Sequence, residues 1–286
     1  MEEMGPILTN HDHLEHFKLG VAFITHEGSP RKNREKELRA KVEGAFSGVD
    51  LVDITNWYSI SWQPNFYKIK NREYLRSLAF RLRSGIEWHE GSIIRIMIQA
   101  TLFELKSLLN GRSQLTLPQN YLYVAKVVTE KHVRSWVNAL EDSVDALLIL
   151  EDDAILQDNS IETLSQAIQF IKHQMPTYIN LSKGNNLKDY KKEYSENSQE
   201  AGWFKLRAAD TAGAYLVNRN GLEVLAGKYS EAPNTAVLAI DFMASDVLIR
   251  NKEFEVYHTD SPPFLNGTLL GLFETQTGSV PQFGTE

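Results

Sequence analysis

The segment Asp145-Ala146-Leu147-Leu148-Ile149-Leu150 constrains the fold more than any other part of this sequence. After Asp145 it is uninterrupted apolar sequence, which is typical of a central strand covered on both faces. It runs directly into Glu151-Asp152-Asp153. Open α/β sheets bind ligands outside the carboxyl ends of their strands. The pattern therefore predicts an α/β fold with an acidic group at the edge of the sheet where ligands bind.

The segments on either side extend this α/β pattern. Leu19 to Thr25 is predicted as a buried strand, a helix follows from about Lys32 to Phe46, and residues 49–54 alternate as a second strand. This opening is a β-α-β unit, which implies parallel pairing. Further strands are predicted at 121–128, 178–181, 214–217 and 254–257, and further helices at 130–140, after a capping Ser160, from Asn220 and at 241–250.

Residues 1–286 are predicted to form a single domain, with a Rossmann-like, mostly parallel central sheet flanked by helices. Residues 57–119 interrupt the alternation of strands and helices and are interpreted as a helical insertion. The polar segment 183–201 is too long for a tight turn and is predicted to be a mobile loop or an extended hairpin. The final residues, 275–286, are expected to form a flexible tail.

The composition argues against several classes of protein. The chain has 30 Lys and Arg against 37 Asp and Glu, a net charge of −7, which makes a general nucleic-acid binder improbable on charge grounds. It has no cysteine, so disulfides, thiolate metal sites and a cysteine nucleophile are excluded. The acidic N-terminal residues do not resemble a signal peptide. We expect a cytoplasmic protein, at most peripheral at the inner face of a membrane.

The acidic triplet Glu151-Asp152-Asp153 is the strongest candidate for chemistry. Carboxylates spaced one residue apart can reach one hard divalent cation such as Mg²⁺ or Mn²⁺. Such a cation can bridge the two phosphates of a nucleotide diphosphate and neutralise its charge as it leaves. The alternative is that these acids cap the next helix or face solvent. The usual dehydrogenase, NTPase, hydrolase and zincin motifs do not occur in the sequence.

Other charged residues have a functional and an ordinary interpretation. Asp241 lies at the start of a predicted helix, where an acid is commonly a cap or a dipole partner. It could instead be a general base on an acceptor hydroxyl in an inverting enzyme, or orient the acceptor in a retaining one. Asp210 is a weaker candidate of the same kind. Arg31, Arg34 and Lys183 are candidate phosphate contacts or plain surface charges.

The segment Leu148 to Ala154 resembles the "LEDDA" signature of family 25 glycosyltransferases, the lipooligosaccharide galactosyltransferase type. In that family the segment stands in for the Asp-X-Asp motif of the GT-A fold. The resemblance implies a GT-A-like domain whose metal and diphosphate site is centred on Glu151-Asp152-Asp153. Asp153 would bind the metal directly, and Glu151 would contact the nucleotide ribose or a metal-bound water. His258, which follows a strand, would supply a third metal ligand, although a lone histidine there is more often structural.

Three further stretches are similar to the family in the right order, and a fourth, residues 129–132 with Trp136, resembles it only faintly. The Phe23-Ile24-Thr25-His26 stretch with Arg31 and Arg34 resembles its opening strand and arginine-containing turn, which faces the nucleotide. Residues 210–217 with Asn220-Gly221 resemble its acceptor region, and residues 239–241 its "P-x-D" segment. Residues 129–132 with Trp136 resemble its Ser-His…Trp helix, without the serine before His132. The insertion at 57–119 also departs from the family pattern.

These observations predict a metal-dependent hexosyltransferase. It would use Mn²⁺ or Mg²⁺ and a nucleotide sugar, such as UDP-galactose or another UDP-hexose, and its acceptor would be a hydroxyl of a surface glycan such as lipooligosaccharide or capsule. A lipid-linked acceptor would bring it to the membrane surface. Two alternatives remain open: a nucleotidyltransferase that uses the same acids, and a catalytically silent binding protein of the same fold.

Overall fold

The computed structural model describes residues 17–25, 34–46, 49–53, 119–158, 160–172, 174–183, 202–207, 209, 211–231, 240–268 and 270. The helices within these ranges are α1 (Arg34–Ala45), α4 (Gln119–Glu141), α5 (Ile161–Ile171), α6 (Arg219–Glu231) and α7 (Ile240–Arg250). The strands are β1 (Lys18–Ile24), β2 (Asp50–Asp53), β3 (Ala146–Glu151), β4 (Ala154–Leu156), β5 (Thr177–Asn180), β6 (Ser182–Lys183), β7 (Trp203–Lys205), β8 (Ala214–Asn218), β9 (Glu255–Thr259) and β10 (Phe264–Asn266).

The main sheet has the strand order β2-β1-β3-β8-β5-β9-β7, and a smaller sheet has the order β4-β10-β6. In the main sheet β1 pairs in parallel with β2 and β3, and β5 pairs in parallel with β9. Strand β8 is antiparallel to both of its neighbours, and β7 is antiparallel to β9. All main-sheet strands except β8 and β7 therefore share one direction, which confirms a mostly parallel sheet and the parallel β1-α1-β2 opening.

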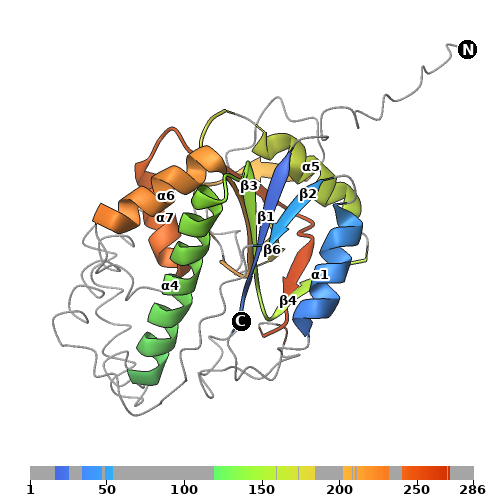
Figure 1. The fold of residues 1–286 in the computed structure, drawn as a ribbon, viewed down its shortest axis with the longest axis horizontal. Helices are drawn as coiled ribbons and strands as arrows, with labels where there is room; N and C mark the ends of the chain where they lie inside the picture. Colours follow the sequence, from blue (N-terminus) through green and yellow to red (C-terminus); the bar gives the residue numbers. More distant parts are fainter. Residues whose placement is uncertain are drawn as a thin grey trace, which may run out of the picture.

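Helices cover both faces of the main sheet, as Figure 1 shows. On one face, side chains of α4, α6 and α7 such as Trp136, Leu222 and Met243 are buried against the sheet. On the other face, α1 and α5 do the same with side chains such as Val42 and Ile168. Residues Ala146 to Leu150 of β3 are 0% exposed and alternate between these two cores. The predicted central strand covered on both faces is thus confirmed.

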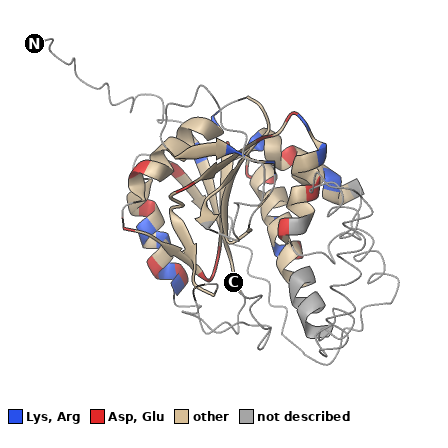
Figure 2. Cartoon of the chain, turned by 180° about the vertical axis from the view of Figure 1, so that it is seen from behind, with Lys and Arg blue, Asp and Glu red and all other residues tan. Residues whose placement is uncertain are grey.

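The charged side chains lie mainly on the helices and at the ends of strands, as Figure 2 shows. Helix α1 illustrates the pattern, because it buries Leu38 and Val42 and carries the ion pairs Arg39–Glu35 and Lys41–Glu37 one turn apart. Such pairs at i and i+4 stabilise an exposed helix modestly. Few charged side chains are buried in the described part of the chain, so those that are, such as Lys131 and Asp153, are candidates for function.

The strand predicted at residues 121–128 is wrong, since α4 begins at Gln119 and continues without a break to Glu141. A short apolar run cannot be distinguished from a buried helical segment by its periodicity alone. No glycine or proline separates Val128 from the helical pattern that follows. Helix propagation adds one hydrogen bond for each residue it fixes, so the helix extends through this run.

Two further local predictions need correction. Ser160 does precede α5, but its side chain makes no capping bond to that helix, because its hydroxyl donates to the Pro263 carbonyl at 3.1 Å. Helix α6 begins one residue before Asn220, and Asn218 accepts a hydrogen bond from the Gly221 amide at 2.9 Å. Strands β4, β7 and β10 were not predicted, since each spans only three residues.

Several predictions concern residues outside the described ranges. These are the helical insertion up to residue 118, the tail at 275–286 and all of the segment 183–201 except Lys183, which ends β6. Among the residues that are described, no helix combines the length and the apolar character needed to cross a membrane.

Candidate functional site at the carboxyl ends of β1 and β3

The strand order reverses between β1 and β3, which is the position where open α/β sheets typically have a crevice. From β1 the chain passes through α1 to β2 on one side, while β3 lies on the other side of β1. Helices α1 and α4 cover opposite faces at this point (Figure 1). Ligands of open α/β sheets bind where the strand order reverses in this way, outside the carboxyl ends of the strands. The two ends meet here, because Ile24 is paired with Glu151.

The acidic triplet lies directly at this crevice. The Glu151 amide donates to the Gly213 carbonyl at 2.8 Å, and the Asp152 amide donates to the Ile24 carbonyl at 3.1 Å. The Asp153 carbonyl accepts from the Gly267 amide at 2.9 Å. The triplet is therefore held by the ends of β1, β8 and β10 rather than by its own strand alone. The Glu151 side chain is 25% exposed, whereas Asp153 is only 7% exposed.

Two of the predicted nucleotide-contacting residues lie against the triplet. Thr25 Oγ1 donates to Asp152 Oδ2 at 3.3 Å. Arg34 donates from Nη1 to the Asp152 carbonyl at 3.1 Å and from Nη2 to the Ala154 carbonyl at 3.3 Å. These hydrogen bonds connect α1 to the turn after β3. Arg34 therefore stabilises this turn, independently of any role in ligand binding.

Lys131 is a buried cation beside the same turn. It is 4% exposed, and its Nζ donates to the Thr25 carbonyl. Burial lowers its pKa to about 8, because the ammonium loses hydration, and the nearby negative charge of Asp152 opposes that shift. The crevice thus contains positive charge from α4 next to negative charge from the end of β3.

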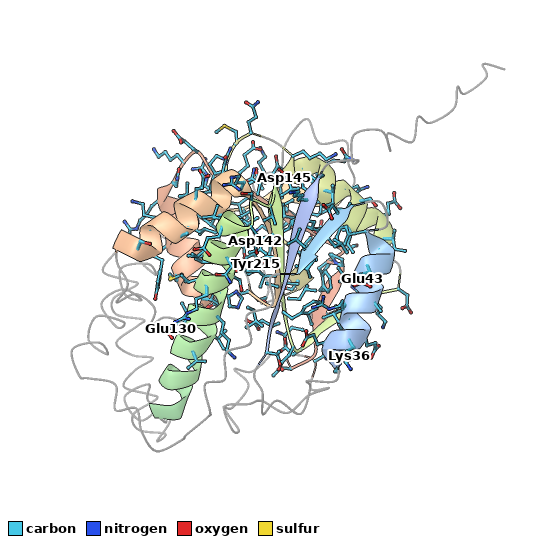
Figure 3. The ribbon with its side chains drawn as sticks, in the orientation of Figure 1. Lys36, Glu43, Glu130, Asp142, Asp145 and Tyr215 are labelled. Carbon is cyan, nitrogen blue, oxygen red and sulfur yellow. The ribbon has the colours of Figure 1, made fainter. Side chains whose placement is uncertain are left out.

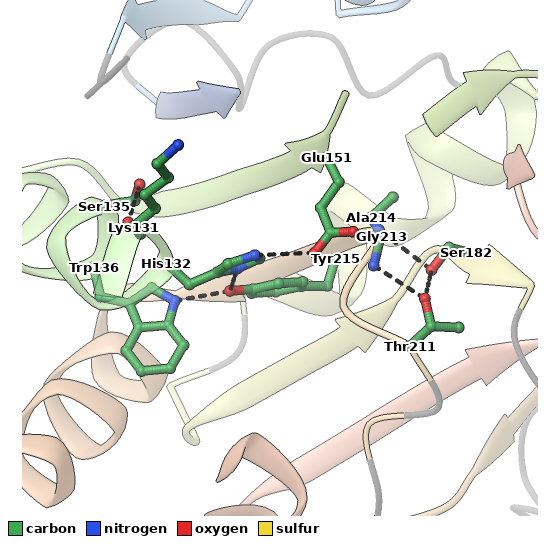
Figure 4. A network of polar contacts seen from close by, with 10 residues as sticks. All are labelled: Lys131, His132, Ser135, Trp136, Glu151, Ser182, Thr211, Gly213, Ala214 and Tyr215. Carbon is green, nitrogen blue, oxygen red and sulfur yellow. Dashed lines mark hydrogen bonds and ion pairs between the residues drawn. The ribbon is translucent and has the colours of Figure 1, made fainter. Parts of the chain in front are cut away.

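A chain of buried hydrogen bonds leads from α4 to Glu151, as Figure 4 shows. Trp136 Nε1 lies 3.0 Å from the Tyr215 hydroxyl oxygen, and that oxygen lies 2.8 Å from His132 Nδ1. His132 Nε2 lies 3.2 Å from Glu151 Oε1. The His132 and Tyr215 rings stack with centroids 5.6 Å apart. Trp136 and His132 are 0% exposed and Tyr215 is 1% exposed, so only the Glu151 end reaches solvent.

The His132 imidazole is neutral near pH 7. Complete burial lowers its pKa to about 3, the carboxylate of Asp241 opposes the shift, and the charge of Lys131 adds to it. Its contact with Glu151 is therefore a hydrogen bond from a neutral ring to a carboxylate and not an ion pair. Burial also raises the pKa of Tyr215 well above its ordinary value, so the phenol keeps its hydrogen.

Asp241 lies in the first turn of α7, as expected. Its negative charge acts on His132, which places its carboxylate on the α4 side of the sheet near the buried network. A carboxylate in the first turn is also favoured by the helix dipole. Asp241 therefore lies in a helix that packs on the same face of the sheet as α4, as its neighbours Ile240 and Met243 also show.

His258 lies on the face of the main sheet that carries Tyr215, but several strands away from β3. Ile179 is paired with Tyr257, so Asn180 and His258 are neighbours, and Asn180 is itself paired with Tyr215. His258 is 1% exposed, its ring stacks on Phe204 with centroids 5.5 Å apart, and its Nε2 donates to the Leu206 carbonyl at 3.1 Å. Two strands, β8 and β5, separate it from the acidic triplet. His26, Arg31 and Asp210 lie outside the described residues, and for Lys183 only the backbone is described.

The described residues include no group of three or more His, Asp or Glu side chains arranged to hold a metal. A magnesium-type site does not need one, because this ion commonly keeps several waters and binds through one or two carboxylates together with substrate phosphates. Glu151 and Asp153 carry hard oxygen donors and lie two residues apart at the carboxyl end of β3, and the His132 ring is hydrogen-bonded to Glu151. The chemistry of these donors therefore fits a divalent cation shared with a diphosphate.

Four residues of this arrangement lie in stretches that resemble the family but were not predicted as site residues: Lys131, His132, Trp136 and Tyr215. A usable signal was present, since His132 and Trp136 are four residues apart on the inward face of one helix. No protein-family model matches this chain, and no curated protein shows significant similarity to it. The family resemblance thus remains a prediction.

Proposed function

We propose that this chain is a metal-dependent glycosyltransferase that moves a hexose from a nucleotide diphosphate to an acceptor hydroxyl. One observation carries the proposal. The stretches that resemble family 25 glycosyltransferases are far apart in sequence, yet His132, Trp136, Tyr215 and Glu151 from three of them belong to one hydrogen-bond network. Tyr215 is 83 residues from His132 and 79 from Trp136. Chance similarity in separate segments does not predict such convergence.

The proposed reaction forms a bond between the acceptor oxygen and C1 of the hexose, while the bond from C1 to the diphosphate oxygen breaks. The acceptor proton passes to a base, for which Asp241 is the candidate in an inverting enzyme. In a retaining enzyme Asp241 would orient the acceptor. Asp153 and Glu151 would hold Mn²⁺ or Mg²⁺, which when bound neutralises charge on the departing diphosphate.

The GT-A arrangement, a UDP-hexose donor and a surface-glycan acceptor form the finer part of the proposal. The mostly parallel sheet with helices on both faces is compatible with this arrangement. A crevice that holds acidic side chains next to Lys131 and Arg34 suits a ligand in which a cation and phosphates bind together. A lipid-linked acceptor would bring the protein to the inner face of a membrane.

The first test is the melting temperature with UDP, GDP, ADP and CDP, each with and without Mn²⁺. A ligand at a hundred times its Kd adds about 2.7 kcal/mol of stability, which raises the melting temperature by several degrees. We expect one diphosphate to stabilise the protein in a Mn²⁺-dependent manner. Asp153→Asn should abolish that effect. Asp142→Asn is the matched control, because Asp142 (labelled in Figure 3) is exposed in the turn that precedes β3, whereas the triplet follows that strand.

The same sample then separates the alternatives. Incubation with the matching nucleotide hexose and an acceptor should release nucleoside diphosphate, whereas a nucleotidyltransferase would release pyrophosphate. Binding of a diphosphate without turnover of any nucleotide hexose would favour a silent binding protein. No stabilisation by any nucleotide in a folded sample would contradict the proposed function.

A further inference from the structure

The donors and acceptors in the buried network allow only one direction for its hydrogen bonds. The indole of Trp136 can only donate, so the Tyr215 oxygen accepts from it. An ionised carboxylate can only accept, so His132 Nε2 must carry a hydrogen and donate it to Glu151. The Tyr215 oxygen accepts from Trp136 and donates its own hydrogen to His132 Nδ1, 2.8 Å away, so Nδ1 is the acceptor. Both ends of the network therefore require the same tautomer of His132.

The network is also rigid, and its two ends are unlike. The rings of His132 and Tyr178 stack against Tyr215, with centroids 5.6 Å and 5.0 Å away. These rings and Trp136 have no more than 1% of their surface exposed. The last group, the Glu151 carboxylate, is 25% exposed and lies at the carboxyl end of β3, where Glu151 is paired with Ile24 of β1. The buried hydrogen-bond donors Trp136, Tyr215 and His132 thus lead to Glu151, which is the partly exposed member of the network.

We infer that His132 is a positioning residue, which holds the Glu151 carboxylate in its orientation for a divalent cation through a tautomer locked by Tyr215 and Trp136. The part of this inference that concerns the cation rests on the proposed function, whereas the tautomer and its hydrogen bond to Glu151 do not. Partners that orient a metal-binding side chain typically change metal affinity by about 10–100-fold when they are removed. The alternative role is purely structural, namely the satisfaction of buried polar groups in the core.

Two variants of His132 distinguish these roles. His132→Gln offers an amide that can donate to Glu151 and accept from Tyr215, whereas His132→Leu can do neither. We expect the Mn²⁺ affinity, titrated by calorimetry with the metal alone and again with saturating UDP, to fall about 10–100-fold in the leucine variant. The glutamine variant should stay within a few-fold of the unmodified protein. Ser135→Ala is the control, since this buried serine of α4 donates its hydroxyl to the Lys131 carbonyl and has no part in the described network.

An NMR experiment on protein with ¹⁵N-labelled histidine tests the tautomer separately. We expect His132 to carry its hydrogen on Nε2 alone, and the Nε2–H resonance to shift in Glu151→Gln. A hydrogen on Nδ1 would overturn the inference, as would a folded leucine variant that binds Mn²⁺ as tightly as the unmodified protein. If the leucine variant does not fold, the resonance decides, because an unshifted Nε2–H resonance in Glu151→Gln would overturn the inference.

The unmodified protein separates this inference from the proposed function. If it binds no Mn²⁺ with or without UDP, the proposed function fails, and the inferred role toward a cation fails with it. The NMR result then decides whether His132 still holds the Glu151 carboxylate. If the protein binds Mn²⁺ but His132 carries its hydrogen on Nδ1, only the inference fails.

Discussion

The burial of Lys131 predicts how the stability of this protein depends on pH. Its pKa is lowered from 10.5 to about 8 in the folded chain. Below pH 8 both states carry the charge, and the folded state bears the cost of burying it. Between about pH 8 and 10.5 the unfolded state binds more protons, so the free energy of unfolding rises with pH. The cost of the buried charge is absent above that window.

We therefore expect Lys131→Met to stabilise the protein at pH 7, by on the order of 1–3 kcal/mol, and to flatten the rise in stability between pH 8 and 10. Urea denaturation at several pH values measures both effects. Lys36→Met, at an exposed position of α1, should leave the pH dependence unchanged. A loss of stability in Lys131→Met at every pH would show that the hydrogen bond to the Thr25 carbonyl outweighs the buried charge.

The Tyr215 hydroxyl has a second measurable effect at the residue scale. In Tyr215→Phe the Trp136 N–H loses its acceptor and His132 Nδ1 loses its donor, both in fully buried surroundings. An unsatisfied buried polar group costs about 1–3 kcal/mol, so we expect a loss of at least that size in urea denaturation. Tyr257→Phe is the matched control. The Tyr257 hydroxyl donates to the Glu255 carboxylate, which also accepts a hydrogen bond from Lys205 and keeps that bond in the variant. An equal loss in both variants would contradict this account.

At the scale of elements, helix α6 contains two glycines in opposite situations. A Cβ on Gly221 would lie 2.7 Å from Val217 Cγ1 and 3.0 Å from the Thr177 carbonyl, because the start of α6 packs closely on the sheet. A Cβ on Gly227 would meet nothing within 4 Å. We expect Gly221→Ala to destabilise by about 1–3 kcal/mol and Gly227→Ala to stabilise by about 0.5–1 kcal/mol. Thermal denaturation of both variants checks this, and the same sign for both would refute it.

At the scale of the whole molecule, β3 joins two cores that lie on opposite faces of one sheet. Leu148 belongs to the core under α1 and α5, and Ile149 to the core under α4, α6 and α7. We expect Leu148→Ala and Ile149→Ala each to cost about 2–5 kcal/mol and each to keep a single unfolding transition. Ile161→Ala, at a side chain that is 58% exposed, should change stability by less than about 0.5 kcal/mol. Separate transitions seen by circular dichroism and tryptophan fluorescence would show that the two cores unfold independently.

The sequence alone determined the features that depend on local pattern. The uninterrupted apolar run before Glu151 identified a central strand, because a strand covered on both faces has no polar side to present. The alternation of strands and helices from Leu19 to residue 54 identified a parallel opening unit. The position of the acidic triplet at a strand end predicted the candidate site, since the carboxyl ends of parallel strands share one edge of the sheet.

Only the tertiary structure decided which distant residues meet. The antiparallel insertion of β8 between β3 and β5 brings Tyr215 next to His132 and Trp136, and no local pattern encodes that pairing. Residues 121–128 were predicted as a strand but belong to helix α4. A short apolar run is compatible with either structure, and the packing of the whole segment decides between them. The neutrality of His132 and the lowered pKa of Lys131 follow from burial, which is a property of the assembled fold.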